Sequence, residues 1–175
     1  MEFRFETNYD LKALSAMAKS IRKTIRKKHS RRSHVFGWIV TVLALLLLLP
    51  LGDKPFVLNF NTVVTAVAAL VILLTLLFED KLNGYVAKKR MPVGTDKAVA
   101  VFTPESYVST TELGRSEFRY DKIVSLAETK DYFVFVIDAS HAQVYAKNTI
   151  IGGSVQEFRE FICGVTQKQF QTVNE

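Results

Sequence analysis

Cysteine, histidine and tryptophan are scarce in this chain, and their scarcity excludes several classes of protein. The 175 residues include one cysteine (Cys163), three histidines and one tryptophan. A single cysteine excludes an internal disulfide framework and is typical of a reducing compartment. No His and Cys residues show the spacing of a metal site. The N-terminal stretch MEFRFETNYD also lacks the charged-then-apolar pattern of a cleaved signal peptide.

Motifs that carry catalysis or cofactor binding are missing as well. Residues 152–153 are a glycine pair that opens a helix, but the lysine and the further glycines of a phosphate loop are absent. Asp121, Asp131 and Asp138 each fall at a predicted turn, where Asp is favoured for local hydrogen bonding, and do not indicate a catalytic carboxylate pair. Cys163 lies on a predicted helix and is interpreted as a packing residue. We therefore expect no enzyme activity, no cofactor and no metal.

Charge is absent from two long apolar runs, residues 35–51 and 56–78, which are separated by the short segment 52–55. At ~1.5 Å per residue these runs would form helices of roughly 25 and 34 Å, against a hydrocarbon core of about 30 Å. The sequence therefore predicts a transmembrane helical hairpin. The lack of ionisable residues inside the runs argues against an ion or proton pathway.

Net positive charge lies beside these runs, whereas the C-terminal part of the chain is slightly acidic. The formal charge is +9 over residues 11–34 and +2 over residues 79–97, whereas residues 98–175 sum to −3. A nucleic-acid-binding protein would carry its basic patch on the folded surface, so we expect no nucleic-acid partner. The positive-inside rule predicts a multi-pass protein with both termini in the cytoplasm and the Asp53 loop outside.

A basic helix is predicted ahead of the first apolar run. Residues 2–7 alternate like a strand, and Asn8 or Asp10 is placed to cap a helix over residues 11–28. One face of this helix is apolar and the opposite face is basic. Two interpretations remain open: the basic face contacts anionic lipid headgroups, or the apolar stripe packs on the folded domain and the charges are solvated. The candidate headgroup contacts, with those that follow the second run, are Lys19, Arg22, Lys23, Arg26, Lys27, Lys28, Arg31, Arg32, Lys88, Lys89 and Arg90.

Short strands dominate the chain after residue 97, and a helix follows them. The predicted strands cover residues 98–103, 107–113, 116–120, 123–129, 132–137 and 142–146. Their hairpin spacing is typical of an antiparallel meander. Ser154 and Glu157 fit a capping box for a helix over residues 155–167, whose apolar stripe we expect to close one open end of the sheet. We also expect the strand at residues 2–7 to pair with an edge of this sheet.

These patterns divide the chain into four segments. The segments are 1–34 (strand and basic helix), 35–78 (transmembrane hairpin), 79–97 (linker) and 98–170 (cytoplasmic domain). The fold class is thus a membrane α+β protein, in which a two-helix hairpin carries an antiparallel sheet closed by a C-terminal helix.

Two stretches resemble the YcxB-like family of small bacterial membrane proteins. They are SEFRYDKIVSLAETKDYFVFVI (residues 116–137) and SVQEFREFI (residues 154–162). The resemblance implies a cytoplasmic domain like that of pleckstrin-homology (PH) proteins, which is a bent sheet plugged by its final helix. It also implies a bacterial inner membrane, and it supplies no activity and no catalytic residues.

The leading hypothesis is therefore a non-enzymatic membrane protein whose cytoplasmic module binds a partner protein or regulates at the membrane. One alternative is self-protection against a membrane-acting peptide, as in bacteriocin immunity, and a lesser one is a small transporter subunit. The expected partners are the lipid bilayer, with its anionic headgroups, and an unidentified protein; a homo-oligomer is a further option.

Overall fold

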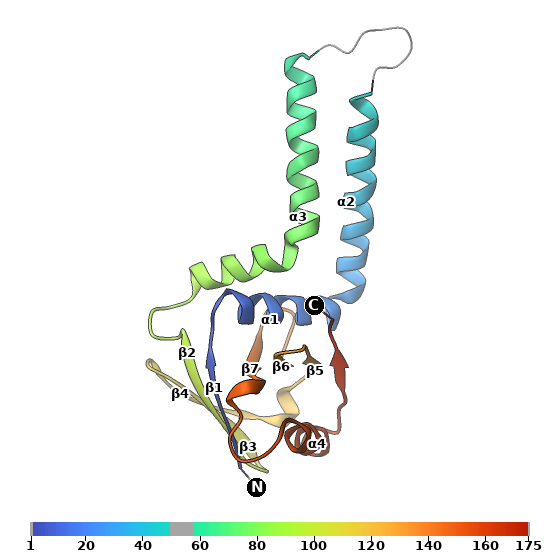
Figure 1. The fold of residues 1–175 in the computed structure, drawn as a ribbon. Coiled ribbons are helices and arrows are strands. Elements are labelled where there is room, and N and C mark those ends of the chain that lie inside the picture. The colour runs from blue at the N-terminus through green and yellow to red at the C-terminus, as the bar shows by residue number, and fades with distance from the viewer. Residues whose placement is uncertain (1, 50–57, 175) are drawn as a thin grey trace. The chain divides into compact units, whose positions relative to one another are not determined.

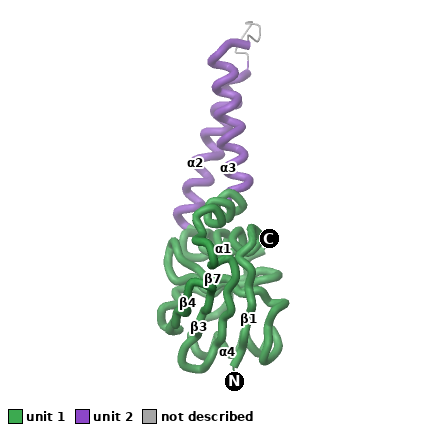
Figure 2. The backbone as a smooth tube through the Cα atoms, turned by 90° about the vertical axis from the view of Figure 1, so that its left-hand side faces the viewer, with its two compact units in different colours: residues 1–27, 80–175 green, residues 28–79 purple. Residues whose placement is uncertain are grey.

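The computed structural model describes residues 2–49 and 58–174, and these residues form two compact units. Unit 1 comprises residues 1–27 and 80–175, and unit 2 comprises residues 28–79 (Figure 2). The expected outer loop at Asp53 lies outside the described residues.

The elements follow one another along the chain as Figure 1 shows. They are β1 (Phe3–Asn8), α1 (Leu11–Lys23), α2 (Lys27–Leu47), α3 (Phe60–Arg90), β2 (Lys97–Phe102), β3 (Ser106–Thr111), β4 (Gly114–Arg119), β5 (Ser125–Glu128), β6 (Tyr132–Val136), β7 (Ala142–Ala146), α4 (Val155–Thr166) and β8 (Phe170–Thr172). Two single-turn 3₁₀ helices, η1 (Tyr120–Lys122) and η2 (Lys147–Thr149), complete the described elements.

Unit 1 contains two four-stranded sheets, with orders β1-β2-β3-β4 and β7-β6-β5-β8. The predicted N-terminal strand is confirmed as an addition to the later sheet, because β1 pairs antiparallel with β2 from Phe3↔Phe102 to Asn8↔Lys97. The single six-stranded meander is corrected to two sheets. In addition β8, which the sequence did not reveal, pairs parallel with β5. The chain leaves β4 through η1 before it enters β5, so the meander is interrupted at that point.

An aromatic core joins the two sheets to α4. Phe5 of β1, Phe102 of β2 and Phe133 of β6 are fully buried. Phe158 of α4 lies among them, with ring centroids 4.6, 5.0 and 5.1 Å away, respectively. The capping box predicted for this helix is present, since the Ser154 hydroxyl accepts from the Glu157 backbone and the Glu157 carboxylate accepts from the Ser154 backbone. The helix thus begins where its apolar face can cover the core.

Helix α1 ends earlier than the predicted residue 28. It stops at Lys23, and Thr24 leaves the helical region with φ −100° and ψ −90°. Both the hydroxyl and the backbone N–H of Thr24 donate to the Ser20 carbonyl, at 2.7 and 3.0 Å. This local bonding closes the helix, and a turn over residues 24–26 leads into α2.

Unit 2 contains α2 and the first part of α3. Within the part of the chain that the structure describes, one helix, α3, is long and apolar enough to cross a membrane, with a mean hydropathy of 2.4 over its most apolar stretch. The predicted transmembrane hairpin is therefore supported for one helix of the two. Helix α2 begins in the basic segment and ends at Leu47. Its apolar part therefore covers residues 35–47 of the predicted run of 35–51.

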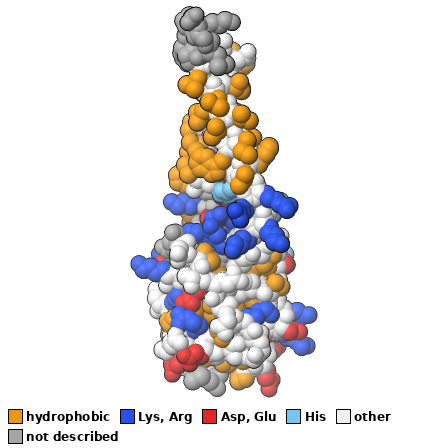
Figure 3. Space-filling view, turned by 90° about the vertical axis from the view of Figure 1, so that its right-hand side faces the viewer, with side chains coloured by type: hydrophobic (Ala, Val, Ile, Leu, Met, Phe, Trp, Pro, Cys, Tyr) orange, Lys and Arg blue, Asp and Glu red, His pale blue; other side chains and the backbone are white. Residues whose placement is uncertain are grey.

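The two helices pack closely within unit 2. A Cβ on Gly37 of α2 would lie 2.8 Å from a methyl carbon of Leu76 on α3, and Thr41 and Ala69 are buried. The remaining large apolar side chains of these helices are mostly exposed, and on the face drawn in Figure 3 they gather over this unit. Exposed apolar side chains around a helix pair are typical of a lipid-facing surface.

Helix α3 continues past the apolar run. Its backbone is non-helical at Phe78 (φ −114°, ψ 17°), and the helix then extends to Arg90. The first part of the predicted linker 79–97 is thus helical. Residues 79–91 contain no proline that would break the helix. Its last turn holds Lys88, Lys89 and Arg90, and positive charge stabilises the C-terminal end of a helix.

The aromatic core gives a first prediction. Replacing Phe158 with alanine removes ring contacts to both sheets and should lower the free energy of unfolding of unit 1 by about 3–5 kcal/mol. Denaturant unfolding of the detergent-solubilised full chain, followed by tyrosine fluorescence, measures this. Phe161→Ala removes a partly buried ring of the same helix and should cost clearly less. Equal losses for the two variants would contradict a core centred on Phe158.

Candidate functional site

Helix α1 packs its apolar face on the folded unit. Asp10 caps its first turn through a 2.7 Å hydrogen bond from the Ala13 N–H. Ala13 and Ile21 are buried in a cluster with Val134 of β6 and Val144 of β7. The apolar stripe thus packs on the domain, as one of the two interpretations expects, while contact of the opposite basic face with lipid headgroups stays a prediction. Lipid insertion of this stripe would require the helix to leave a core.

The end of α3 lies against α1 in the same unit. The Arg22 guanidinium and the Asp80 carboxylate form a two-bonded ion pair, with the Nε donating at 2.7 Å. A Cβ on Gly84 would lie 2.8 Å from the backbone nitrogen of Ser15, so only glycine permits this approach. The Lys88 ammonium donates to the Tyr9 carbonyl at 3.0 Å. The helix that carries the apolar run is thus anchored in the folded unit by packing and by charge.

The candidate headgroup residues are divided between the two units. Arg22 forms an ion pair with Asp80, and its side chain is only 17% exposed. Lys19 is half-buried, whereas Lys23, Arg26 and Lys27 of unit 1 are exposed. Lys88, Lys89 and Arg90 at the end of α3 are exposed too. Lys28, Arg31 and Arg32 are exposed residues of unit 2.

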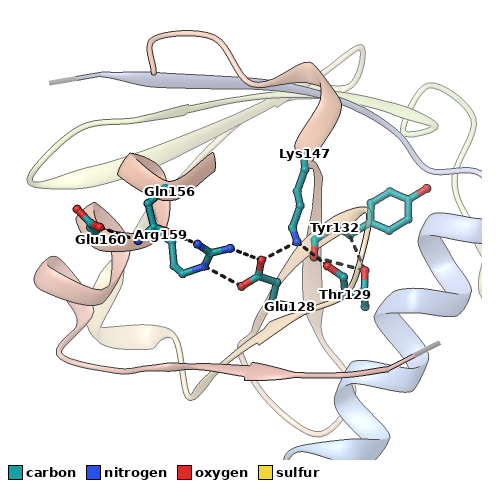
Figure 4. A network of polar contacts seen from close by, with 7 residues as sticks. All are labelled: Glu128, Thr129, Tyr132, Lys147, Gln156, Arg159 and Glu160. Carbon is teal, nitrogen blue, oxygen red and sulfur yellow. Dashed lines mark hydrogen bonds and ion pairs between the residues drawn. The ribbon is translucent and has the colours of Figure 1, made fainter. Parts of the chain in front are cut away.

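A second polar group, centred on Glu128 of β5, was not foreseen from the sequence. The Glu128 carboxylate accepts hydrogen bonds from the Lys147 ammonium at 2.6 Å and from the Arg159 Nε at 2.9 Å and Nη2 at 2.6 Å (Figure 4). The side chains of Glu128 and Lys147 are both 14% exposed. The strand pattern gave no sign of these partners, because they come from η2 and α4, 19 and 31 residues further along the chain.

The electrostatics of this group favour an ionised carboxylate. Partial burial alone would raise the pKa of Glu128, but the hydrogen bonds and charges of Arg159 and Lys147 outweigh it, so the pKa is lowered. The Lys147 ammonium also lies 5.0 Å from the centre of the Phe133 ring. Arg159 is in turn held by the Gln156 side-chain oxygen. The cluster ties β5, η2 and α4 together.

A pocket of about 440 Å³ adjoins this cluster. Its lining residues are Glu128, Thr129, Lys130, Arg159, Thr172, Val173 and Asn174. Arg159 is already paired with Glu128. The contacts of Glu128 with Lys147 and Arg159 therefore supply structural cohesion beside the pocket.

The remaining chemistry-bearing side chains are dispersed. His141 lies 2.7 Å from Asp138 in an exposed turn, and His34 lies 2.6 Å from Glu79 in unit 2. Cys163 is a free thiol on α4, partly exposed. Within residues 2–49 and 58–174, no group of three His, Cys, Asp or Glu residues is placed to hold a metal ion.

Fold and site together define an α+β protein in which a folded unit shares a helix with an apolar segment long enough to cross a membrane. Residues 102–162 match the family model of the YcxB-like proteins. The resemblance noted in the sequence is thereby confirmed for this segment, which runs from the end of β2 into α4. No curated protein and no solved structure matches the chain.

The close approach at Gly84 gives a second prediction. Gly84→Leu should force α3 away from α1 and destabilise unit 1 by about 1–3 kcal/mol, because the new side chain meets the backbone of Ser15. Hydrogen exchange over residues 80–90 should become faster in the variant. Asn83→Leu, on an exposed neighbour in the same helix, is the matched control and should change neither property.

The Glu128 cluster gives a third prediction, with a defined pH dependence. Glu128→Gln should lower the free energy of unfolding at pH 7 by about 1–3 kcal/mol. Because the folded-state pKa is lowered, the carboxylate stabilises the fold above its unfolded pKa of about 4.3 and loses this effect as the pH falls through the folded value. The difference between wild type and variant should therefore shrink below about pH 4.3.

Glu160→Gln is the control for this experiment, since Glu160 is exposed and bonds only to Gln156 among the contacts of Figure 4. It should leave stability within about 0.5 kcal/mol of wild type. A difference for Glu128→Gln that stays constant down to acid pH would show that the carboxylate charge is not what stabilises the cluster.

Proposed function

We propose that this chain is a non-enzymatic, bacterial inner-membrane protein whose cytoplasmic unit is a binding module held at the membrane. Unit 1 would face the cytoplasm with both termini, and unit 2 would span the bilayer twice. We also propose that unit 1 has a PH-like fold. Its two sheets, with α4 over their common core, are compatible with such a fold.

The observation that carries the proposal is the pairing of β1 with β2. These strands precede and follow the helices of unit 2, yet they share six residue pairs in one sheet. If α3 crosses a membrane once, the chain must also return, because both strands lie on one side. The run that begins in α2 is the available return path, and it is uncharged from residue 35 to residue 51.

Charge supports the same orientation. The exposed Lys and Arg residues of both units flank the apolar helices, as the positive-inside rule requires of a cytoplasmic side. Each such residue near an anionic leaflet contributes about 1 kcal/mol. A binding role is favoured over catalysis because Glu128 and Arg159, the charged residues that meet at the pocket, are paired with each other.

The native cysteine tests this topology. A membrane-impermeant maleimide should label Cys163 in inverted inner-membrane vesicles and not in intact spheroplasts. In a Cys163→Ser background, Asn59→Cys at the start of α3 should show the opposite pattern. Labelling of Cys163 from the outside, or recovery of the chain in the soluble fraction after cell lysis, would overturn the proposal.

A further inference from the structure

The two sheets of unit 1 have four outer edges; other segments bond to two of them, and a third belongs to a very short strand. Along the outer edge of β1, the backbone groups of Arg4 and Ile151 bond to each other at 2.9 Å in both directions, and the Glu6 N–H donates to the Thr149 hydroxyl. The outer edge of β7 is met by the Thr7 hydroxyl, which accepts from the Ala146 N–H at 3.1 Å. The strand β8 is only three residues long.

The outer edge of β4 is different. This strand has six residues and pairs with β3 on one side, and no described strand pairs with its other side. Five of its six residues are exposed. Unpaired edges of this length are sites of strand addition, so their side chains decide what can pair there.

Those side chains alternate in charge on the solvent face of the sheet. Arg115, Glu117 and Arg119 share that face, while Phe118 points to the other, where its ring stacks on Tyr107 at 5.2 Å. The existing contacts of the charged residues are local and exposed. Arg119 lies 3.3 Å from Asp121, and Glu117 accepts from the Ser106 hydroxyl.

We propose that the outer edge of β4 binds the same edge of a second copy of this chain, antiparallel, in the register that places Glu117 opposite Arg119. A two-fold axis at Phe118 repeats this pair, so each copy contributes one carboxylate and one guanidinium. Opposite charges facing across antiparallel strands attract, and like charges repel. The two aromatic rings would meet on the other face, where Phe118 already extends the core of its own copy.

Two neighbouring registers are disfavoured by the same residues. A shift that places Glu117 opposite itself also places Arg115 opposite Arg119, which brings like charges together at every position. A one-residue slip would turn Phe118 to the solvent face of the partner. A register centred on Ser116 would also bring opposite charges together, Glu117 against Arg115, but it would place Phe118 opposite Gly114. The register centred on Phe118 is therefore the one that joins both the opposite charges and the two aromatic rings. The proposal goes beyond membrane anchoring and does not depend on it, although a shared membrane would keep the two copies at high local concentration.

Charge reversal on the full-length chain tests the proposal. Two copies with different affinity tags are co-expressed, and one is captured from detergent-solubilised membranes. Arg119→Glu alone and Glu117→Arg alone should each lower recovery of the other copy at least about fivefold, because each places like charges opposite one another. The double variant Glu117→Arg/Arg119→Glu should restore recovery, since it exchanges the two charges.

The chain offers a matched control on β1. Arg4 and Glu6 are the same residue types at the same spacing, and both are exposed on a strand whose two edges are occupied. Arg4→Glu and Glu6→Arg should leave recovery unchanged. Thermal unfolding of every variant separates loss of pairing from loss of folding.

Disulfide trapping tests the register itself. In a Cys163→Ser background, copies carrying Glu117→Cys and Arg119→Cys should form a mixed disulfide when co-expressed and oxidised, because residues opposite each other lie within disulfide reach. Copies that all carry Glu117→Cys alone should form little disulfide-linked dimer. Failure of wild-type copies to co-purify, recovery that ignores the charge reversals, or capture of a different protein at this edge would each overturn the proposal.

Discussion

The pairing of β1 with β2 is the constraint on which the rest of this structure depends. It joins residues 3–8 to residues 97–102, across all of the helices of unit 2. Without β1 the first sheet would lose an edge strand and the core would lose Phe3 and Phe5, both fully buried. The folded unit is therefore incomplete until the whole apolar segment has been made. This couples the folding of unit 1 to the path that the chain takes through unit 2.

The same constraint explains why α1 and the end of α3 contact each other through an ion pair and a close backbone approach. The chain leaves unit 1 after α1 and returns to it within α3, so both points are fixed in the sequence. The Arg22–Asp80 ion pair and the approach of Gly84 to Ser15 fix these two exits against each other. A mostly buried, two-bonded ion pair of this kind is worth more than an exposed one, because solvent screens it less and both charges keep hydrogen bonds.

Much of the fold was predictable because local signals were strong. The capping box at Ser154, the apolar run of β6 and the alternation of β1 each identified an element whose bounds agree within one or two residues. The division into two sheets and the strand β8 were not predictable. A three-residue strand has little pattern, and its parallel pairing with β5 depends on where α4 ends. The Glu128 cluster was missed for a related reason: ion pairs between distant segments leave no periodicity in the sequence.

The basic helix shows where sequence patterns stop being decisive. An apolar stripe of the kind on α1 fits a lipid surface and a protein core equally well, and the presence of β6 and β7 beneath it decides for the core. Its positive charges then cannot act through insertion of the same helix. Without inserted apolar groups, surface charge gives attraction that is weak and screened within about 8–10 Å at physiological salt. If α3 crosses a bilayer as proposed, that attraction would add little to the strength of anchoring. Its main physical consequence would be to fix on which side of the membrane the flanking residues remain.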